Sequence, residues 1–306
     1  MEIPNQGSRK LAQQIQLENG AIVRTRRKPS LAALAAVTGL FLLGAGLPAA
    51  AQGHAEAAAR LPAVLAGPQR SAKNRARDRY RHPLQTLMFF GIKPDMTVVE
   101  IWPGAGWYTE ILAPYLKDHG KLYEAVPPGV AETRFRAKLA ADPSVYGKII
   151  VTELLPPKKT VIAPPGSADM VLTFRNVHDW TARGNAEAYF QAMYRALKPG
   201  GILGVVDHHA RPDLPNDQLD RSGYMRESEM VGLARKAGFR LIGQSNINAN
   251  PKDSTRHPAG VWTLPPTLTL GQKDRAKYLA IGESNRMTLK FAKPLKKTAA
   301  RSNEAP

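Results

Sequence analysis

Short runs of apolar, β-branched residues alternate with helical patterns along most of the chain, and this alternation constrains the fold more than any other feature. Runs typical of buried strands occupy residues 97–101, 122–126, 148–151, 170–174, 202–206, 239–243 and 287–291. Helical spacing of apolar residues marks 108–115, 185–197 and 230–237. Strands that alternate with helices over short turns build a mostly parallel sheet covered on both faces. We therefore expect an α/β fold with a doubly wound, seven-stranded sheet.

The same patterns predict one folded domain with irregular ends. The alternation is confined to residues 77–294, which we take as the domain. The alanine-rich segment 52–76 is expected to be a mobile lead-in, and residues 295–306 a disordered tail. Within the domain, residues 248–285 are rich in proline and glycine and show no periodicity. An insertion of that length inside a compact domain is expected to be functional or a lid.

The first 51 residues predict an export signal. A basic cluster, Arg24–Lys28, precedes an uncharged stretch from Leu31 to Leu47, and Ala49-Ala50-Ala51 is a small-residue cleavage site. We expect residues 1–51 to be a leader with a signal peptide and the mature protein to be periplasmic or secreted. The uncharged stretch is short and rich in alanine and glycine, so no stable membrane span is expected after cleavage.

The beginning of this leader is unlike a signal peptide. Residues 1–22 are polar and contain two acids, whereas a signal peptide begins with a basic region. We expect translation to start at Val23, which leaves a standard leader. Thr25-Arg26-Arg27 resembles a twin-arginine signal, the type that exports folded proteins.

Charge and cysteine content narrow the possible partners. The chain has no cysteine, which excludes disulfides and thiolate metal sites. Its formal net charge is +18, a field that favours an anionic small-molecule or cell-envelope substrate. A nucleic-acid partner is not expected, because no helix-turn-helix or aromatic-interleaved basic pattern accompanies the charge. The sequence does not indicate an oligomeric state.

A glycine turn follows the first predicted strand. Gly104-Ala105-Gly106 lies between residues 97–101 and the helical pattern at 108–115. Glycines at such a turn let the backbone approach a ligand closely, and the following helix offers unpaired N–H groups to it. By itself, Gly-x-Gly is equally compatible with a tight turn that binds nothing.

The residues around this turn resemble a known family. Val98–Gly106 resembles the first motif of the class I S-adenosylmethionine-dependent methyltransferases. Asp169–Leu172 resembles that family's fourth-strand motif, and Leu197–Leu203 its turn into the fifth strand. The resemblance spans residues 84–294 and implies a Rossmann-like sheet with an antiparallel last strand. It also implies S-adenosylmethionine as cofactor.

Three shorter segments resemble a subfamily of exported methyltransferases. They are Trp102–Glu110, Phe174–His178 and Gly260–Pro266. This narrower resemblance implies export and methyl transfer, and it does not indicate the substrate.

Carried onto this chain, the resemblance places seven residues around the cofactor: Glu100, Trp102, Gly104, Gly106, Glu124, Glu153 and Asn176. Two positions depart from the family pattern. Trp102 stands where the family has an earlier glycine, and Val126 stands where it has the acid that binds the ribose. Glu124 lies two residues before Val126 on the same face of the strand, so it is the expected substitute.

Polar side chains at the ends of the fourth and fifth strands are the catalytic candidates. Methyl transfer needs an aligned nucleophile and a group that removes its proton. His178 is the first candidate for that general base, followed by Asp207 and His208. These side chains could also hold zinc or manganese. Neighbouring strand residues such as His208 and His209 point to opposite faces, so we expect no metal.

Three functions remain open from the sequence. The first is a methyltransferase that uses S-adenosylmethionine to methylate an O or N acceptor. The second is an exported, non-catalytic binding protein that retains this fold, since the cofactor is made in the cytosol and the cofactor motif has two departures. The third, a metal-dependent hydrolase, depends on the histidines alone.

Overall fold

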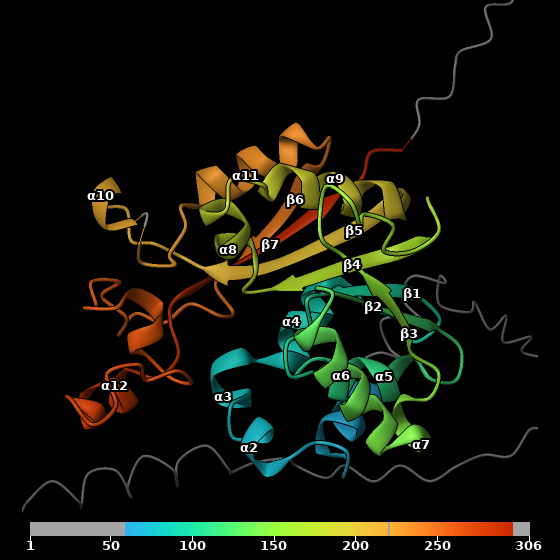
Figure 1. Ribbon diagram of the computed structural model, residues 1–306, viewed down its shortest axis with the longest axis horizontal. Coiled ribbons are helices and arrows are strands. Elements are labelled where there is room, and N and C mark those ends of the chain that lie inside the picture. Colours follow the sequence, from blue (N-terminus) through green and yellow to red (C-terminus); the bar gives the residue numbers. More distant parts are fainter. Residues whose placement is uncertain (1–58, 220, 296–306) are drawn as a thin grey trace, which may run out of the picture. The chain divides into compact units, whose positions relative to one another are not determined.

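The computed structural model describes residues 59–219 and 221–295 (Figure 1). The expected leader at residues 1–51, the start at Val23 and the tail beyond residue 295 lie outside the described residues and stay predictions. Among the described residues, no helix has both the length and the apolar character of a membrane span. Residues 59–66 form a helix whose Leu61 is fully buried, so part of the expected mobile lead-in packs on the domain.

A seven-stranded sheet forms the centre of the domain, in the order β3-β2-β1-β4-β5-β7-β6. Its strands are β1 (Thr97–Ile101), β2 (Lys121–Val126), β3 (Ile150–Glu153), β4 (Ala168–Phe174), β5 (Leu197–His208), β6 (Arg240–Ser245) and β7 (Arg286–Ala292). Strands β1 to β5 pair in parallel, and β7 runs antiparallel between β5 and β6. This confirms the expected Rossmann-like, mostly parallel sheet with an antiparallel last strand.

Helices cover both faces of this sheet. The helices of the described residues include α2 (Ala72–Arg75), α3 (Asp78–Arg81), α4 (Pro83–Phe90), α5 (Thr109–Leu116), α6 (Val130–Ala141), α7 (Pro143–Tyr146), α8 (Val177–Ala182), α9 (Ala186–Ala196), α10 (Asn216–Leu219), α11 (Glu227–Lys236) and α12 (Arg275–Ile281). In Figure 1, α8, α9 and α11 lie over one face, and α4 and α5 lie over the other. Common capping residues mark the ends of α4: Pro83 is its first residue, and Gly91, at φ 84°, is its C-cap.

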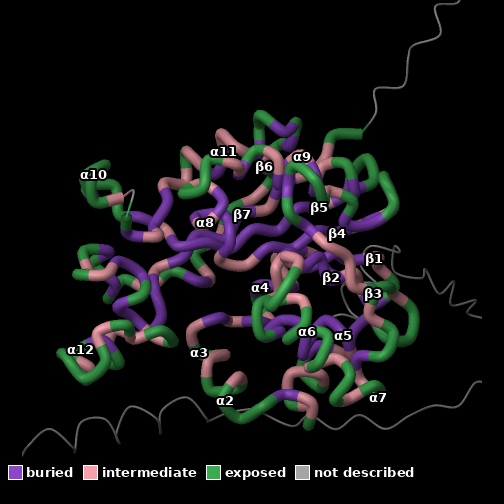
Figure 2. The backbone as a smooth tube through the Cα atoms, viewed as in Figure 1, coloured by how far each residue is buried: buried purple, intermediate pink, exposed green. Residues whose placement is uncertain are grey.

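Each face of the sheet carries its own apolar core. One core joins the strands to α8, α9 and α11 and contains Trp180, Tyr189 and Phe190. The other joins them to α4 and α5 and contains Phe90 and Ile111. The buried strands run between the more exposed helices in Figure 2. Burial on both faces explains why the strands read as nearly continuous apolar runs.

The strand order creates a switch point at one edge of the sheet. From β1 the chain moves outward to β2 and β3, then returns to place β4 on the other side of β1. Ligands of open α/β sheets bind at the carboxyl ends of the strands beside such a point. The glycine turn after β1 and the polar residues after β4 and β5 all lie at this edge.

The insertion at residues 248–285 is irregular, as expected, and two short helices interrupt it. They are the 3₁₀ helix η1 (Gly260–Thr263) and α12. The buried carboxylate of Asp253 fastens the insertion, because it accepts the Tyr224 hydroxyl at 2.7 Å and the Asn285 N–H at 2.7 Å. The insertion is therefore tied both to the loop after β5 and to the segment that leads into β7.

Candidate functional site

The turn after β1 has the backbone form of a glycine-rich ligand loop. Trp102, Gly104 and Gly106 adopt φ values of 49°, 60° and 77°. Glycine enters this left-handed region freely, whereas other residues do so rarely. Trp102 thus adopts a backbone conformation that glycine favours.

The indole of Trp102 packs away from the middle of this turn. Its ring meets Trp180 and Tyr189 edge-on, with centroids 5.7 Å and 5.4 Å apart, and its Nε1 donates to the Leu154 carbonyl at 3.1 Å. A Cβ built on Gly104 would meet no atom of the described residues within 4 Å. The space over Gly104 is therefore open, and the turn fits a ligand that approaches the backbone closely, as S-adenosylmethionine would.

Glu100 and Glu124 lie opposite each other on β1 and β2, and both are buried. The Thr109 hydroxyl donates to Glu100 at 3.0 Å, whereas neither carboxylate oxygen of Glu124 has a hydrogen-bond partner among the described residues. Burial raises the pKa of Glu100 to about 7. Burial and the neighbouring Glu100 raise the pKa of Glu124 well above its usual value. Burial therefore favours the protonated form of both carboxyl groups.

The other two cofactor candidates lie at neighbouring strand ends. Glu153 ends β3 in register with Val126, and its carboxylate pairs with Lys159 at 2.8 Å. The Asn176 side-chain N–H donates to the Ile101 carbonyl at 2.9 Å, which links the segment after β4 to the end of β1. Both residues border the switch point, and their contacts with a cofactor stay predictions.

His178 and Asp207 form a buried pair where β4 and β5 end. His178 Nδ1 lies 2.9 Å from the Asp207 carboxylate, and both side chains are shielded from solvent. Because a carboxylate only accepts, Nδ1 carries the proton and Nε2 is left as the basic atom. Burial opposes a positive charge on His178, but the Asp207 carboxylate outweighs it, so the pKa of His178 is raised.

Backbone groups hold Asp207 in place. Its two oxygens accept the N–H groups of His208 at 2.7 Å and Val177 at 2.8 Å. The ring of His208 lies 4.9 Å from that of His178, and its Nδ1 contacts the Ser284 hydroxyl. Burial, with the nearby His178 and Arg175, lowers the pKa of His208 well below its usual value.

The three catalytic candidates could by geometry surround a cation. Ligand atoms of His178, Asp207 and His208 lie within 4.8 Å of one another. However, both oxygens of Asp207 already accept hydrogen bonds, and the guanidinium groups of Arg175 and Arg286 oppose positive charge on His208. The expectation that no metal binds here stays a prediction.

An arginine cluster beside this pair was missed by the sequence analysis. Arg77, Arg81 and Arg286 bind the buried Glu283 with N–O distances of 2.7, 3.1 and 3.2 Å. Arg175, which adopts φ 63° directly after β4, adds a fourth guanidinium, and its Nε has no partner among the described residues. The only local signal is the three-residue spacing of Glu283 and Arg286, because the other arginines come from distant segments.

Two cavities flank His178. A smaller one, of about 130 Å³, is lined by Arg175, His208, Trp262 and Glu283 besides His178. A larger one, of about 330 Å³, shares His178 and Trp262 and extends to Leu219, Tyr224 and Met225. The insertion contributes Trp262 to both, so it forms part of the wall of each cavity.

Solved structures share this architecture. A SAM dependent methyltransferase from Aquifex aeolicus is similar at 16% identity and a TM-score of 0.50, over 77% of this chain and 98% of that one. The [4+2]-cyclase SpnF is similar at 16% identity and a TM-score of 0.51, over 80% and 96%. This chain has the fold of the class I S-adenosylmethionine-dependent methyltransferases. At such identities the likeness establishes the fold alone.

A third similar structure contains bound ligands. Phosphoethanolamine N-methyltransferase 2 of Haemonchus contortus, in complex with phosphomonomethylethanolamine and S-adenosylhomocysteine, is 17% identical with a TM-score of 0.51. The alignment covers 70% of this chain and 53% of that longer one. No protein-family model matches the sequence, and no curated protein matches it either.

Proposed function

We propose that this protein is an S-adenosylmethionine-dependent methyltransferase that methylates an oxygen or nitrogen of an acceptor held beside His178. One observation carries the proposal: a buried His–Asp pair and an open glycine turn meet at the switch point of a methyltransferase-type sheet. The methyltransferases among the similar structures support the same activity.

The residues of this chain have distinct parts in the proposed reaction. Gly104 leaves room at the turn where the cofactor would bind, while the indole of Trp102 packs against Trp180 and Tyr189. When bound, S-adenosylmethionine supplies an electrophilic methyl group. His178 Nε2 takes the proton of the acceptor's hydroxyl or amine, and Asp207 stabilises the imidazolium that forms. Burial of the pair excludes water, which strengthens both interactions.

The proposal includes export, which the leader motif supports. Transport through the twin-arginine route would carry a folded protein out of the cytosol, the compartment in which the cofactor is made. The expected partner is a small-molecule or cell-envelope acceptor, in keeping with the net charge of +18.

A second candidate function is an exported binding protein without methyltransferase activity. Two residues favour it. Trp102 stands where the methyltransferase family has its first glycine, and Val126 stands where the family has the acid that binds the ribose of the cofactor. The [4+2]-cyclase among the similar structures is an example of this fold with another activity in its name.

Calorimetric titration of the full chain with S-adenosylmethionine and S-adenosylhomocysteine distinguishes the two. The methyltransferase is expected to bind both ligands with dissociation constants in the micromolar range. Absence of binding at millimolar concentrations of either ligand would contradict the methyltransferase and leave the binding protein. A variant with Gly104 replaced by Ala is the specificity control, because its methyl group enters the open space of the turn.

A further inference from the structure

The arginine cluster beside His178 holds more positive charge than its acids neutralise. Four guanidinium groups, those of Arg77, Arg81, Arg175 and Arg286, interact with the single carboxylate of Glu283. Arg81, Arg286 and Glu283 are all buried, with exposed fractions of 6%, 4% and 3%. Placing like charges together out of water is costly unless a counter-ion joins them.

Two other carboxylates lie near the arginine cluster, and neither neutralises its remaining positive charge. Asp207 uses both oxygens for His178 and for backbone N–H groups. The Asp179 side chain is 45% exposed, and its oxygen lies 3.7 Å from His178 Nε2. Even when both are counted with Glu283, the four arginines outnumber the acids.

Two nitrogen atoms of the cluster are left without a partner. Arg77 Nη2 and Arg175 Nε are buried, and neither has a hydrogen-bond acceptor among the described residues. A buried donor of this kind costs free energy until an acceptor reaches it. Arg175 and His178 both line the smaller cavity, so an acceptor in that cavity would lie beside both residues.

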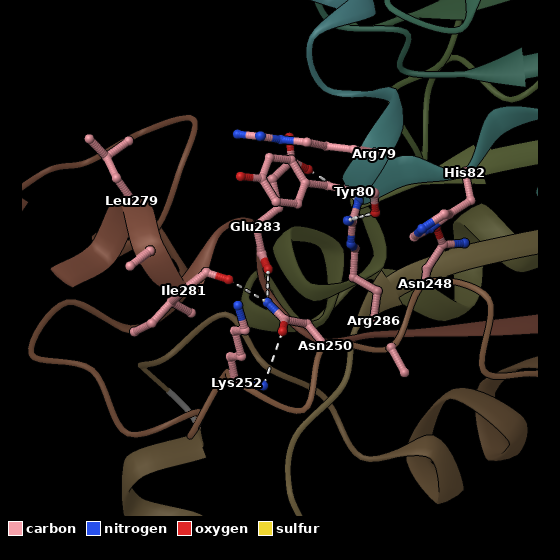
Figure 3. Close-up of a pocket in the computed structure, with 12 residues that line it drawn as sticks. Arg79, Tyr80, His82, Asn248, Asn250, Lys252, Leu279, Ile281, Glu283 and Arg286 are labelled. Atoms are coloured by element: carbon pink, nitrogen blue, oxygen red, sulfur yellow. Dashed lines mark hydrogen bonds and ion pairs between the residues drawn. The ribbon is translucent and has the colours of Figure 1, made fainter. Parts of the chain in front are cut away.

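The cavity has the size and boundary of a subsite for a small anion. Its volume of about 130 Å³ accommodates a single carboxylate or phosphate group. Trp262 forms an apolar wall, Glu283 is occupied by three arginines, and the second lining carboxylate, Asp179, lies 3.7 Å from His178 Nε2. Glu283 and Arg286 also line a separate cavity of about 500 Å³, which Figure 3 shows in close-up, so the charged cluster lies between two hollows.

We propose that the smaller cavity binds an anionic group, a carboxylate or a phosphate, carried by the molecule that His178 deprotonates. The role of His178 in this inference rests on the proposed function, whereas the anion binding does not. Arg175 is the specificity-determining residue of the subsite, because its fork-shaped donor group suits both kinds of oxyanion. The acceptor would then carry its nucleophile close to a negatively charged group.

Thermal unfolding of the full chain tests the subsite with inorganic phosphate and with acetate, each against chloride at the same ionic strength. Ligands that bind only the folded state raise its unfolding midpoint. At about ten times the dissociation constant, a rise of about 3 °C is expected with the preferred anion. The anion that gives the larger rise identifies the group that the acceptor carries.

Arg175→Gln is the informative variant, and Arg195→Gln is its matched control. Arg195 lies exposed on α9, so its replacement removes the same charge away from the cavity. Arg175→Gln is expected to lose the anion-dependent rise and to unfold no earlier than the wild type without anion, because it removes a like charge from the cluster. Arg195→Gln is expected to respond as the wild type does. An equal response of all three proteins would overturn the proposal.

Titration with S-adenosylhomocysteine separates this proposal from the proposed function. If the anion belongs to the acceptor, Arg175→Gln binds S-adenosylhomocysteine as the wild type does. If its affinity falls tenfold or more, the arginines hold the cofactor's own carboxylate and the acceptor subsite is refuted. Anion binding in a wild type that does not bind S-adenosylhomocysteine would retain the subsite and reject the methyltransferase.

Discussion

Asp207 is the single residue on which the candidate site depends most. It lies next to the end of β5, orients His178 through Nδ1, and accepts three backbone N–H groups. A carboxylate in this position selects the tautomer of its histidine and stabilises its protonated form. The chemistry of His178 therefore follows from a neighbour that does not itself meet the acceptor.

The first prediction concerns Asp207→Asn. Removal of the negative charge is expected to lower the pKa of His178, because burial lowers this pKa and the Asp207 carboxylate no longer raises it. Since the folded pKa is raised in the wild type, the stability contributed by His178 is full below about pH 6.5 and is lost as the pH rises through the folded value. Imidazole resonances followed by NMR measure the shift. Asp179→Asn is the control, and an equal shift there would refute the assignment.

The second prediction concerns the buried carboxyl pair. Because burial raises the pKa of Glu100 to about 7, the folded protein binds more protons than the unfolded chain between about pH 4.5 and pH 7. The pair's contribution to stability therefore falls as the pH rises through this window. Glu124→Gln removes one titrating acid and is expected to be more stable than the wild type at pH 8 by on the order of 1–3 kcal/mol.

Urea unfolding of both proteins at pH 5 and pH 8 measures this difference. The advantage of Glu124→Gln is expected to be larger at pH 8. If the difference in unfolding free energy is independent of pH, burial does not raise the pKa values of this pair, and the interpretation of the pair is wrong.

At the scale of elements, the turn between β1 and α5 contains one residue that packs into the core and another that borders the open space where a ligand would bind. The indole of Trp102 belongs to the aromatic core against α8 and α9, whereas Gly104 faces open space. Stability and ligand binding are therefore assigned to different residues of one short segment, and substitutions can test them separately.

The third prediction concerns Gly104→Ala. A side chain at a positive φ of 60° costs about 1 kcal/mol of stability, and its methyl group occupies the space where a ligand would approach. We expect the affinity for S-adenosylhomocysteine to fall about tenfold or more. Gly166→Ala has a similar φ of 67° and equally open surroundings at the opposite end of β4, so it is the matched control. Equal affinities in the two variants would refute a ligand at this turn.

Sequence patterns predicted the elements well because strand and helix signals are local. The runs at 97–101 and 170–174 reappear as β1 and β4 within two residues, whereas β5 begins at Leu197, five residues before its predicted start. Here the glycines at 200 and 201 read as a turn, but the ladder to β4 continues past them with an irregular register.

The candidate site could be predicted only where it follows strand ends. His178 and Asp207 come together because parallel strands β4 and β5 end at the same edge. The arginine cluster could not be foreseen, because Arg81 and Glu283 are 202 residues apart and no periodic pattern links them. The complete burial of Glu124 depends on its register with Glu100, which strand signals do not define.

At the scale of the whole molecule, the insertion at residues 248–285 completes both cavities that border His178. It holds its position through Asp253, which also contacts His257 at 2.8 Å and accepts the Thr255 N–H at 2.8 Å. A buried carboxylate with several charge-assisted hydrogen bonds is a strong local anchor. Removing its charge should therefore affect a whole segment.

The fourth prediction concerns Asp253→Asn. The amide cannot accept all of these hydrogen bonds, and the loss is expected to cost about 1–3 kcal/mol of stability. Cleavage within residues 248–285 by a protease under native conditions should become faster. Asp274→Asn, at an exposed acid of the same insertion, is expected to leave the cleavage rate unchanged. Faster cleavage in both variants would contradict the anchoring role of Asp253.

The contact between Glu283 and the arginines of the first helices has a consequence for how the protein is made. During synthesis, Arg77 and Arg81 leave the ribosome some two hundred residues before Glu283 does. Until then the three guanidinium groups of Arg77, Arg81 and Arg175 lack this carboxylate. The amino-terminal strands can pair early, but the pocket is assembled last, and a truncated chain that ends before residue 283 would never form it.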